Sequence, residues 1–295
     1  MSAVRFPGIT LPLRRILATL LGMSLAVGIL IVPAAAKAPV PAPSDAPTIV
    51  LVHGAFMDAS NWDAVREELD RLGYRTIAVT LAGRGGSASD SDTPSLEAYR
   101  DAVLAAIAGE TRPVVLVGHS FGGITISNVA EAAPDRIAAL VYLAAYLPRN
   151  GQSLQMLAGM DRDSRTAAAF VVDAERGVAS IASDQRGSLF CNDCEPATAK
   201  AAGAMMVSEP LAPLAEPARL GERFARVPRF YIRTAHDLVI SPAQQSRMIA
   251  ATPAAGVLQL DTGHSPMLSQ PGALAALLAD LAAPAASAEE HQNVR

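Results

Sequence analysis

The chain has 295 residues, 51% of them hydrophobic, which is enough for a substantial core in one large domain or two small ones. Its formal net charge is −4 at pH 7, and the sequence has no basic patch of the kind that nucleic-acid binding requires. Composition therefore excludes nucleic acid as a partner, and the function has to be sought in local motifs.

The first 36 residues have the pattern of a secretory signal peptide. Three arginines precede an apolar stretch over 16–32, and the small residues that follow form a cleavage site, which we place after Ala36, with Ala38 as the alternative. An uncleaved membrane anchor is the alternative, but the apolar stretch contains two glycines and falls short of the about 20 residues that a membrane span requires. We therefore predict a secreted or periplasmic protein without stable membrane association after cleavage. A proline-rich linker is expected at 37–47.

From residue 48 onward, short apolar runs alternate with helix-compatible stretches. Runs typical of buried strands lie at 48–52, 74–80, 114–117, 137–143, 229–234 and 256–260. Helices are expected from Ser60 or Asn61 to Leu72, at 93–108, from the residues after Ser120 to 133, at 242–250 and at 271–281. Because the two types alternate through short connections, we predict an α/β fold with a mostly parallel, twisted sheet covered by helices on both faces.

The alternation stops at 147–226, where helical patterns dominate and no strand is evident. We predict that this segment is a helical cap inserted between two parts of the sheet domain, 48–146 and 227–281. The remaining residues, 282–295, are expected to form a disordered tail.

Cys191 and Cys194 are the two cysteines of the chain and lie in the predicted cap. Their C-x-x-C spacing lacks the two further ligands of a zinc site and the βαβ setting of a thioredoxin-like centre. A local disulfide and two unpaired thiols are equally good interpretations, and neither makes the pair catalytic.

The most informative motif is Gly118-His-Ser-Phe-Gly122, between a β-branched apolar run and a helix-compatible stretch. A G-x-S-x-G sequence in this context is typical of a sharp strand-to-helix turn that exposes the serine hydroxyl. The glycines permit the tight bend, and the amino terminus of the following helix can stabilise an oxyanion. We therefore predict that Ser120 is a nucleophile.

A serine hydroxyl needs a neighbouring base, and a third group has to orient that base. Asp237 and His264 follow Ser120 in the chain, and each lies just beyond a predicted strand, at the edge where parallel sheets carry their active sites. We predict that His264 is the base and Asp237 the orienting acid. Asp261 is the alternative acid, although it lies too close to His264 in sequence for the usual arrangement.

Two main-chain N–H groups are predicted to form an oxyanion hole, that of Phe121 after the nucleophile and that of Ala55 in the loop after the first strand. Gly54, Phe56 and His119 adjoin these donors and are predicted to contact the substrate. The side chains of Phe56 and Phe121 are expected to flank the acyl pocket, although an ordinary place in the core is an equally good interpretation for Phe56.

With these motifs the chain resembles the α/β-hydrolase superfamily, and within it the group that contains plant methyl-ester esterases, hydroxynitrile lyases and their bacterial relatives. The resemblance covers about 48–281 and rests on six places: Ile49 to Ala55 followed by Trp62, Gly118 to Gly123, Leu143 to Pro148, Leu189 to Cys194, Asp237 with Pro242 and Gln245, and Gly263 with His264. It implies the same triad and oxyanion donors, no metal or organic cofactor, and a helical cap over a largely apolar pocket.

Two positions separate the esterases from the lyases of this group. The lyases resemble one another in having threonine where this chain has Gly54, and a lysine that stabilises the leaving cyanide where it has Ser265. The chain is therefore similar to the esterase branch, and we expect a serine-dependent carboxylic ester hydrolase acting on small to medium esters, as a monomer or homodimer. The alternatives are a lyase acting on cyanohydrins and a binding protein that captures a small molecule without turnover.

Overall fold

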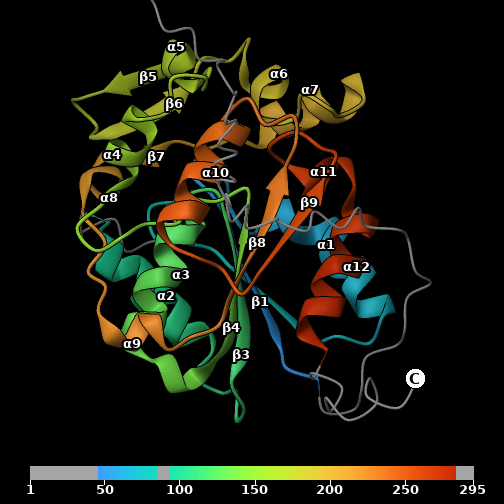
Figure 1. Ribbon diagram of the computed structural model, residues 1–295. Coiled ribbons are helices and arrows are strands. Elements are labelled where there is room, and N and C mark those ends of the chain that lie inside the picture. Colours follow the sequence, from blue (N-terminus) through green and yellow to red (C-terminus); the bar gives the residue numbers. More distant parts are fainter. Residues whose placement is uncertain (1–45, 85–93, 284–295) are drawn as a thin grey trace, which may run out of the picture. The chain divides into compact units, whose positions relative to one another are not determined.

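The computed structural model describes residues 46–84 and 94–283 (Figure 1), all within one compact unit that spans 31–295. The predicted signal peptide and most of the predicted linker lie outside the described residues. So does the predicted tail, apart from its first two residues. No helix among the described residues is long and apolar enough to cross a membrane.

A six-stranded sheet forms the centre of the described part of the chain, and all its neighbouring strands pair in parallel. In spatial order its strands are β2 (Thr76–Val79), β1 (Ile49–Val52), β3 (Val114–His119), β4 (Ile137–Leu143), β8 (Arg229–Thr234) and β9 (Gly256–Leu260). All residues of β1 and β3 are buried, which explains why these strands read as continuous apolar runs. The predicted parallel sheet is confirmed.

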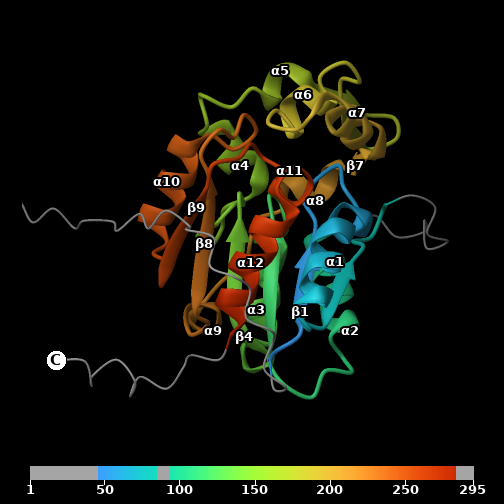
Figure 2. The ribbon, with the colours of Figure 1, turned by 90° about the vertical axis from the view of Figure 1, so that its right-hand side faces the viewer.

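Helices cover both faces of this sheet, as predicted (Figures 1 and 2). On one face α1 (Asp63–Arg71) and α12 (Pro271–Ala282) share an apolar cluster with the sheet. On the other face lie α2 (Leu96–Ala106), α3 (Gly122–Ala132) and α10 (Pro242–Ala251), which contribute to a second cluster.

Several helix boundaries differ from the prediction because of local capping. Before α1 the chain forms a 3₁₀ turn, Ala59–Trp62, and its N-cap is Asp58, whose carboxylate accepts the Ser60 N–H. The α2 helix begins after Ser95, whose hydroxyl caps the N–H of Ala98. A short helix, α11 (Pro266–Ser269), follows His264 and was not predicted.

The segment between β4 and β8 contains both helices and strands. Its helices are α4 (Leu154–Gly159), α5 (Thr166–Ala169), α6 (Arg186–Phe190), α7 (Pro196–Met205), α8 (Leu211–Ala215) and α9 (Glu222–Ala225). Its strands are β5 (Phe170–Asp173), β6 (Val178–Ile181) and β7 (Glu209–Pro210), which form a separate antiparallel sheet. The expectation that this segment lacks strands is wrong. The strands have only two to four residues, too few for a period-two pattern to be recognised.

Most of this inserted segment lies at one end of the main sheet, toward which the arrowheads of β8 and β9 point in Figures 1 and 2. Only α9 lies toward the opposite end, beside α3. We call residues 147–216 the cap. Since the cap stands at the carboxyl ends of the strands, it covers the edge where an open parallel sheet places its ligands.

Candidate active site

Ser120 occupies a strained turn between β3 and α3. Its φ is 51°, in the left-handed region that few residues other than glycine adopt. Three hydrogen bonds hold this conformation: the Ser120 N–H donates to Leu143 O (3.2 Å), and its carbonyl accepts from the N–H groups of Gly123 (3.1 Å) and Tyr146 (3.0 Å). The residue is 5% exposed and lines a cavity beneath the cap. This is the strand-to-helix turn that the motif predicts.

The two glycines of the motif are needed because the bend brings backbone atoms together. A Cβ atom on Gly118 would lie 2.6 Å from Gly122 O, and one on Gly122 would lie 2.6 Å from Val52 O. Neither backbone group can move without disturbing a strand or a helix. The motif therefore has its glycines where side chains cannot be accommodated.

Asp237 follows β8 and is surrounded by hydrogen-bond donors. Its Oδ1 accepts the N–H groups of Val239 (2.8 Å) and Ile240 (2.9 Å). Its Oδ2 accepts from the Thr234 hydroxyl (2.9 Å) and from the Gln245 amide (3.2 Å). Because every partner donates, the pocket suits a carboxylate.

His264, in the loop after β9, completes this arrangement. Its Nδ1 lies 2.8 Å from Asp237 Oδ2, and both side chains are fully buried. A carboxylate can only accept, so Nδ1 carries the proton and Nε2 is left as an acceptor. Nε2 is buried and has no hydrogen-bond partner within the described residues.

The His264 ring also lies beside the surroundings of Ser120. Its centroid is 4.6 Å from that of His119, the residue before Ser120. It is 5.5 Å from the ring of Phe190, which lines the same cavity as Ser120. The structure thus brings Ser120, His264 and Asp237, which are far apart in sequence, to one end of the sheet.

Asp261, the alternative acid, lies elsewhere. Its carboxylate is 2.6 Å from Nε2 of His236, and its side chain is 87% exposed. The contact to His264 therefore belongs to Asp237, because a buried orienting group has to reach the buried Nδ1.

The two predicted oxyanion donors border the same space. Ala55 lines the cavity beside Ser120, and Phe121 follows Ser120 in the turn. Neither main-chain N–H forms a hydrogen bond within the described part of the chain. The Phe121 side chain, however, is fully buried against Tyr99, with the ring centroids 6.0 Å apart. The expectation that this ring flanks the pocket is wrong.

His53 is a residue of this region whose role the sequence did not indicate. Its Nε2 accepts the N–H of Leu81 (3.0 Å), so the proton is on Nδ1, which donates to Gly54 O (2.8 Å). Burial, assisted by the charge of Arg84, lowers the pKa of His53 to about 3. His53 is thus a neutral anchor of the loop that carries Ala55.

Of the three residues predicted to contact substrate, Phe56 alone lines the cavity. Gly54 lies behind Ser120, and a Cβ on it would come within 2.7 Å of Ser120 Cβ. His119 is fully buried, with Nε2 2.9 Å from His264 O. Burial, together with the neighbouring His264, lowers its pKa well below the usual range. His119 therefore supports the His264 loop and does not reach the cavity.

The cavity has a volume of about 600 Å³ and a mainly apolar wall, most of it supplied by the cap. Three phenylalanines form an aromatic group in this wall: the Phe56 ring contacts those of Phe170 and Phe190 edge-on, at 6.1 and 6.0 Å. Its other lining residues beside Ala55 and Ser120 are Tyr146, Leu154, Gln155, Ala158, Gly159, Asp161, Ser164, Thr166, Ala167, Val172, Leu211, Leu214, Ala215 and Val239. An apolar pocket under a cap was predicted, and Ala55, Phe56 and Ser120 were predicted to border it, but the cap residues of its wall were not predicted.

A disulfide joins Cys191 and Cys194, which decides between the two interpretations of the C-x-x-C pair. The turn that it closes lies against the loop of His264. Asn192 donates to His236 O (3.0 Å), and a side chain on Gly263 would collide with Asn192.

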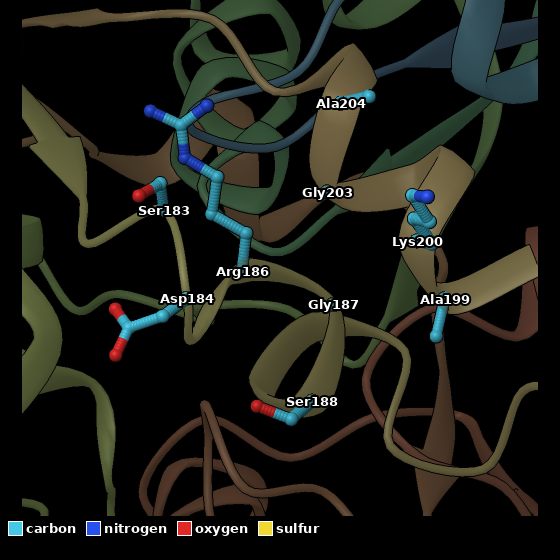
Figure 3. A pocket seen from close by; sticks show the side chains of 9 residues that line it. All are labelled: Ser183, Asp184, Arg186, Gly187, Ser188, Ala199, Lys200, Gly203 and Ala204. Atoms are coloured by element: carbon cyan, nitrogen blue, oxygen red, sulfur yellow. The ribbon is translucent and has the colours of Figure 1, made fainter. Parts of the chain in front are cut away.

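A second cavity, of about 450 Å³, lies in the cap between α6 and α7 (Figure 3). Its wall contains Arg186 and Lys200 but none of the predicted site residues. Within 46–84 and 94–283, no three His, Cys, Asp or Glu side chains form a group that could hold a metal ion.

Comparison with known proteins places this geometry in context. The model of the "Alpha/beta hydrolase family" matches residues 49–277. A "Pyrethroid hydrolase" from Sphingobium wenxiniae is 31% identical over 243 residues, which cover 79% of this chain and 87% of that protein. The "Putative methylesterase 13, chloroplastic" of Arabidopsis thaliana is 29% identical over 251 residues, covering 81% of this chain. The match spans only 56% of that longer methylesterase.

Solved structures show the same likeness. The crystal structure of a pyrethroid hydrolase from Sphingobium faniae JZ-2 superposes with a TM-score of 0.70 at 27% identity, over 80% of this chain and 97% of that one.

Proposed function

The chain belongs to the alpha/beta hydrolase family, and from this premise we propose that it is a serine-dependent carboxylic ester hydrolase. Ser120 is the nucleophile, His264 the general base and acid, and Asp237 the group that orients His264. Ala55 and Phe121 supply the N–H groups of the oxyanion hole.

Acylation begins when Ser120 Oγ attacks the carbonyl carbon of the ester. His264 Nε2 takes the hydroxyl proton as the new C–O bond forms, and the carbonyl oxygen becomes an oxyanion that accepts from the two N–H groups. The tetrahedral intermediate then collapses. The bond to the alcohol oxygen breaks, His264 gives its proton to this oxygen, and the acyl group stays on Ser120.

Deacylation repeats these steps with water. His264 Nε2 takes a proton from the water as its oxygen attacks the acyl carbon, and the same oxyanion hole stabilises the second intermediate. The bond to Ser120 Oγ breaks, the proton returns to this oxygen, and the carboxylic acid leaves. Water is the only reactant besides the ester, and the products are the alcohol and the carboxylic acid.

The observation that carries the proposal is the state of His264. Asp237 holds the proton on Nδ1 at 2.8 Å, and Nε2 is a buried acceptor without a partner in the described chain, beside the turn that presents Ser120. A buried unsatisfied acceptor costs about 1–3 kcal/mol, so its presence here favours a group that receives a proton.

The cavity supports a substrate with an apolar acyl or alcohol group. Its volume of about 600 Å³ and its aromatic wall suit a small or medium ester whose carbonyl reaches Ser120 at one end of the cavity. The names of the relatives, a pyrethroid hydrolase and a methylesterase, are consistent with ester substrates.

We also propose that the protein acts outside the cytoplasm. The first 36 residues carry the signal-peptide pattern, and the disulfide between Cys191 and Cys194 supports an oxidising compartment.

The test is hydrolysis of a panel of p-nitrophenyl and methyl esters by the mature protein. Ser120→Ala should lower kcat/KM by about 10⁴-fold or more, because the nucleophile is lost. Ser164→Ala is the matched control, since it removes another hydroxyl from the same cavity, one that donates to Val239 O and accepts the N–H of Thr166. Unchanged turnover in Ser120→Ala would refute the assignment.

The same preparation separates the alternatives. A fluorophosphonate probe should label Ser120 stoichiometrically if the protein forms an acyl-enzyme. Ligand binding without labelling would indicate a binding protein. Cyanide release from mandelonitrile above background would indicate a lyase, which the serine at position 265 disfavours.

A further inference from the structure

The loop that carries Ala55 contains a second strained residue. Phe56 has a φ of 63°, in the left-handed region, which costs a residue with a side chain about 1–2 kcal/mol. Such a conformation persists only where surrounding contacts impose it. The contacts that fix Phe56 therefore also fix the main chain next to the proposed oxyanion donor.

The cap supplies these contacts. The Phe56 N–H donates to Oε2 of Glu209 (3.0 Å), in β7, and the Phe56 carbonyl accepts the N–H of Val207 (2.9 Å). Glu209 is 153 residues away in sequence and is fully buried. Two residues of the cap, Glu209 and Val207, thus hold both sides of Phe56.

Glu209 has a complete set of buried partners. Arg84 Nη2 is 2.6 Å from the same Oε2, and the Tyr99 hydroxyl donates to Oε1 at 3.2 Å. Arg84 also donates from Nε to Met57 O (3.1 Å), so the ion pair connects to the loop at two places. A buried charge pair of this kind is weak evidence for stability alone, because desolvation offsets much of the attraction.

The two peptide units that flank Ala55 show how the Arg84–Glu209 ion pair affects the main chain at Ala55. The Ala55 N–H shares a peptide unit with Gly54 O, which His53 Nδ1 holds, so in a trans peptide the N–H points away from His53. The next peptide unit carries the Phe56 N–H that Glu209 holds. Ala55 therefore stands between two fixed peptide units, one held by the sheet domain and one by the cap.

We propose that Glu209 is a positioning residue for the oxyanion hole: from the cap it fixes Phe56 and thereby aims the Ala55 N–H at the developing oxyanion. This proposal rests on the proposed function. It makes the cap part of the catalytic machinery as well as a wall of the cavity. Glu209 touches no reacting atom and acts through Phe56 and Ala55.

The test removes the charge pair without leaving a single buried charge. Arg84→Met/Glu209→Met replaces both ions with apolar side chains, a change that buried pairs often tolerate, and it deprives the Phe56 N–H of its acceptor. Arg84→Met/Glu209→Gln restores an acceptor. Glu216→Gln is the matched control, because Glu216 is another cap glutamate that accepts one main-chain N–H of the sheet domain, that of Leu96, away from the loop.

With p-nitrophenyl butyrate we expect the Met/Met variant to lose about 10- to 100-fold in kcat, less than the loss of a whole oxyanion donor, while KM changes little. The Met/Gln variant should recover most of this loss, and Glu216→Gln should match the unmodified enzyme. Unchanged kcat in Met/Met, or equal losses in Met/Met and Met/Gln, would overturn the role of Glu209. Failure of the proposed function is seen separately, as a wild-type protein without turnover or an active Ser120→Ala, and would overturn both.

Discussion

The two sides of Ser120 are held in different ways. On the base side, Asp237 takes hydrogen bonds from residues two, three and eight positions away in sequence. On the oxyanion side, Phe56 is held by Glu209, 153 positions away, and by Val207. Asp237, the proposed acid, is therefore held within one strand–loop–helix unit of the sheet domain, from β8 to α10, whereas the loop that carries Ala55 is also held from the cap.

This difference has a consequence for catalysis. On the proposed function, changes around Glu209 should alter how the substrate carbonyl is bound without disturbing Asp237, the proposed partner of the base. The cap also forms most of the cavity wall, so the substrate pocket and the oxyanion loop share one scaffold. Substitutions on the two sides of Ser120 should accordingly differ in which property they change, and in how large that change is.

The largest effect is expected on the base side. Asp237→Asn keeps the volume of the side chain but removes the charge that holds the proton on His264 Nδ1, and we expect kcat/KM to fall by about 10⁴-fold. Steady-state hydrolysis of p-nitrophenyl butyrate measures this, with circular dichroism to show that the fold is intact.

Asp261→Asn is the control for this substitution. Its carboxylate is exposed and contacts His236, so its loss should leave kcat/KM nearly unchanged. A comparable loss in both variants, or a small one in Asp237→Asn, would show that Asp237 does not orient the base.

A smaller effect is expected on the oxyanion side, where a fall in pH should lower the stability of the fold through His53. The pKa of His53 is about 3 in the folded protein and about 6.5 in an unfolded chain, so the unfolded chain binds a proton that the folded one does not. The stability that the neutral ring provides is complete above pH 6.5 and is lost as the pH falls toward 3. Between these values His53 should lower the free energy of unfolding by about 1.4 kcal/mol per pH unit.

Urea unfolding at pH 7, 5.5 and 4.5 measures this slope. In His53→Gln the slope should be shallower by that amount, even if the variant is less stable throughout. Equal slopes in His53→Gln and wild type would mean that His53 is not a neutral anchor.

The same contrast explains what the sequence could predict. Ser120, Asp237 and His264 each follow a strand that the sequence predicts, so the order of strands predicts their meeting at one sheet edge. The five donors of Asp237 include three that lie within three residues of it. Most of the contacts that hold Asp237 therefore come from residues close to it in sequence, where a local motif can indicate them.

On the oxyanion side, the residues near Phe56 and His53 in the sequence do not indicate their contacts. Nothing near Phe56 indicates that a glutamate in a two-residue strand will hold its N–H, and β7 itself is too short to show a pattern. At His53 the sequence shows only a histidine beside a glycine, and its partner Leu81 lies in the loop after another strand, β2. Contacts between distant segments depend on how the cap folds, which periodicity does not describe.

One element of the cap departs from this division and supplies the smallest expected effect. The Cys191–Cys194 turn lies in the cap but contacts the base side: Phe190 packs on His264, and Asn192 donates to His236 O.

A disulfide that closes so short a loop should contribute about 2 kcal/mol to the free energy of unfolding, which Cys191→Ser/Cys194→Ser would lose. Turnover should fall only a few-fold, because Asp237 and its local donors continue to hold His264. If kcat instead fell as far as in Asp237→Asn while the fold remained intact, the base would also depend on the cap, and the division between the two sides of Ser120 would fail.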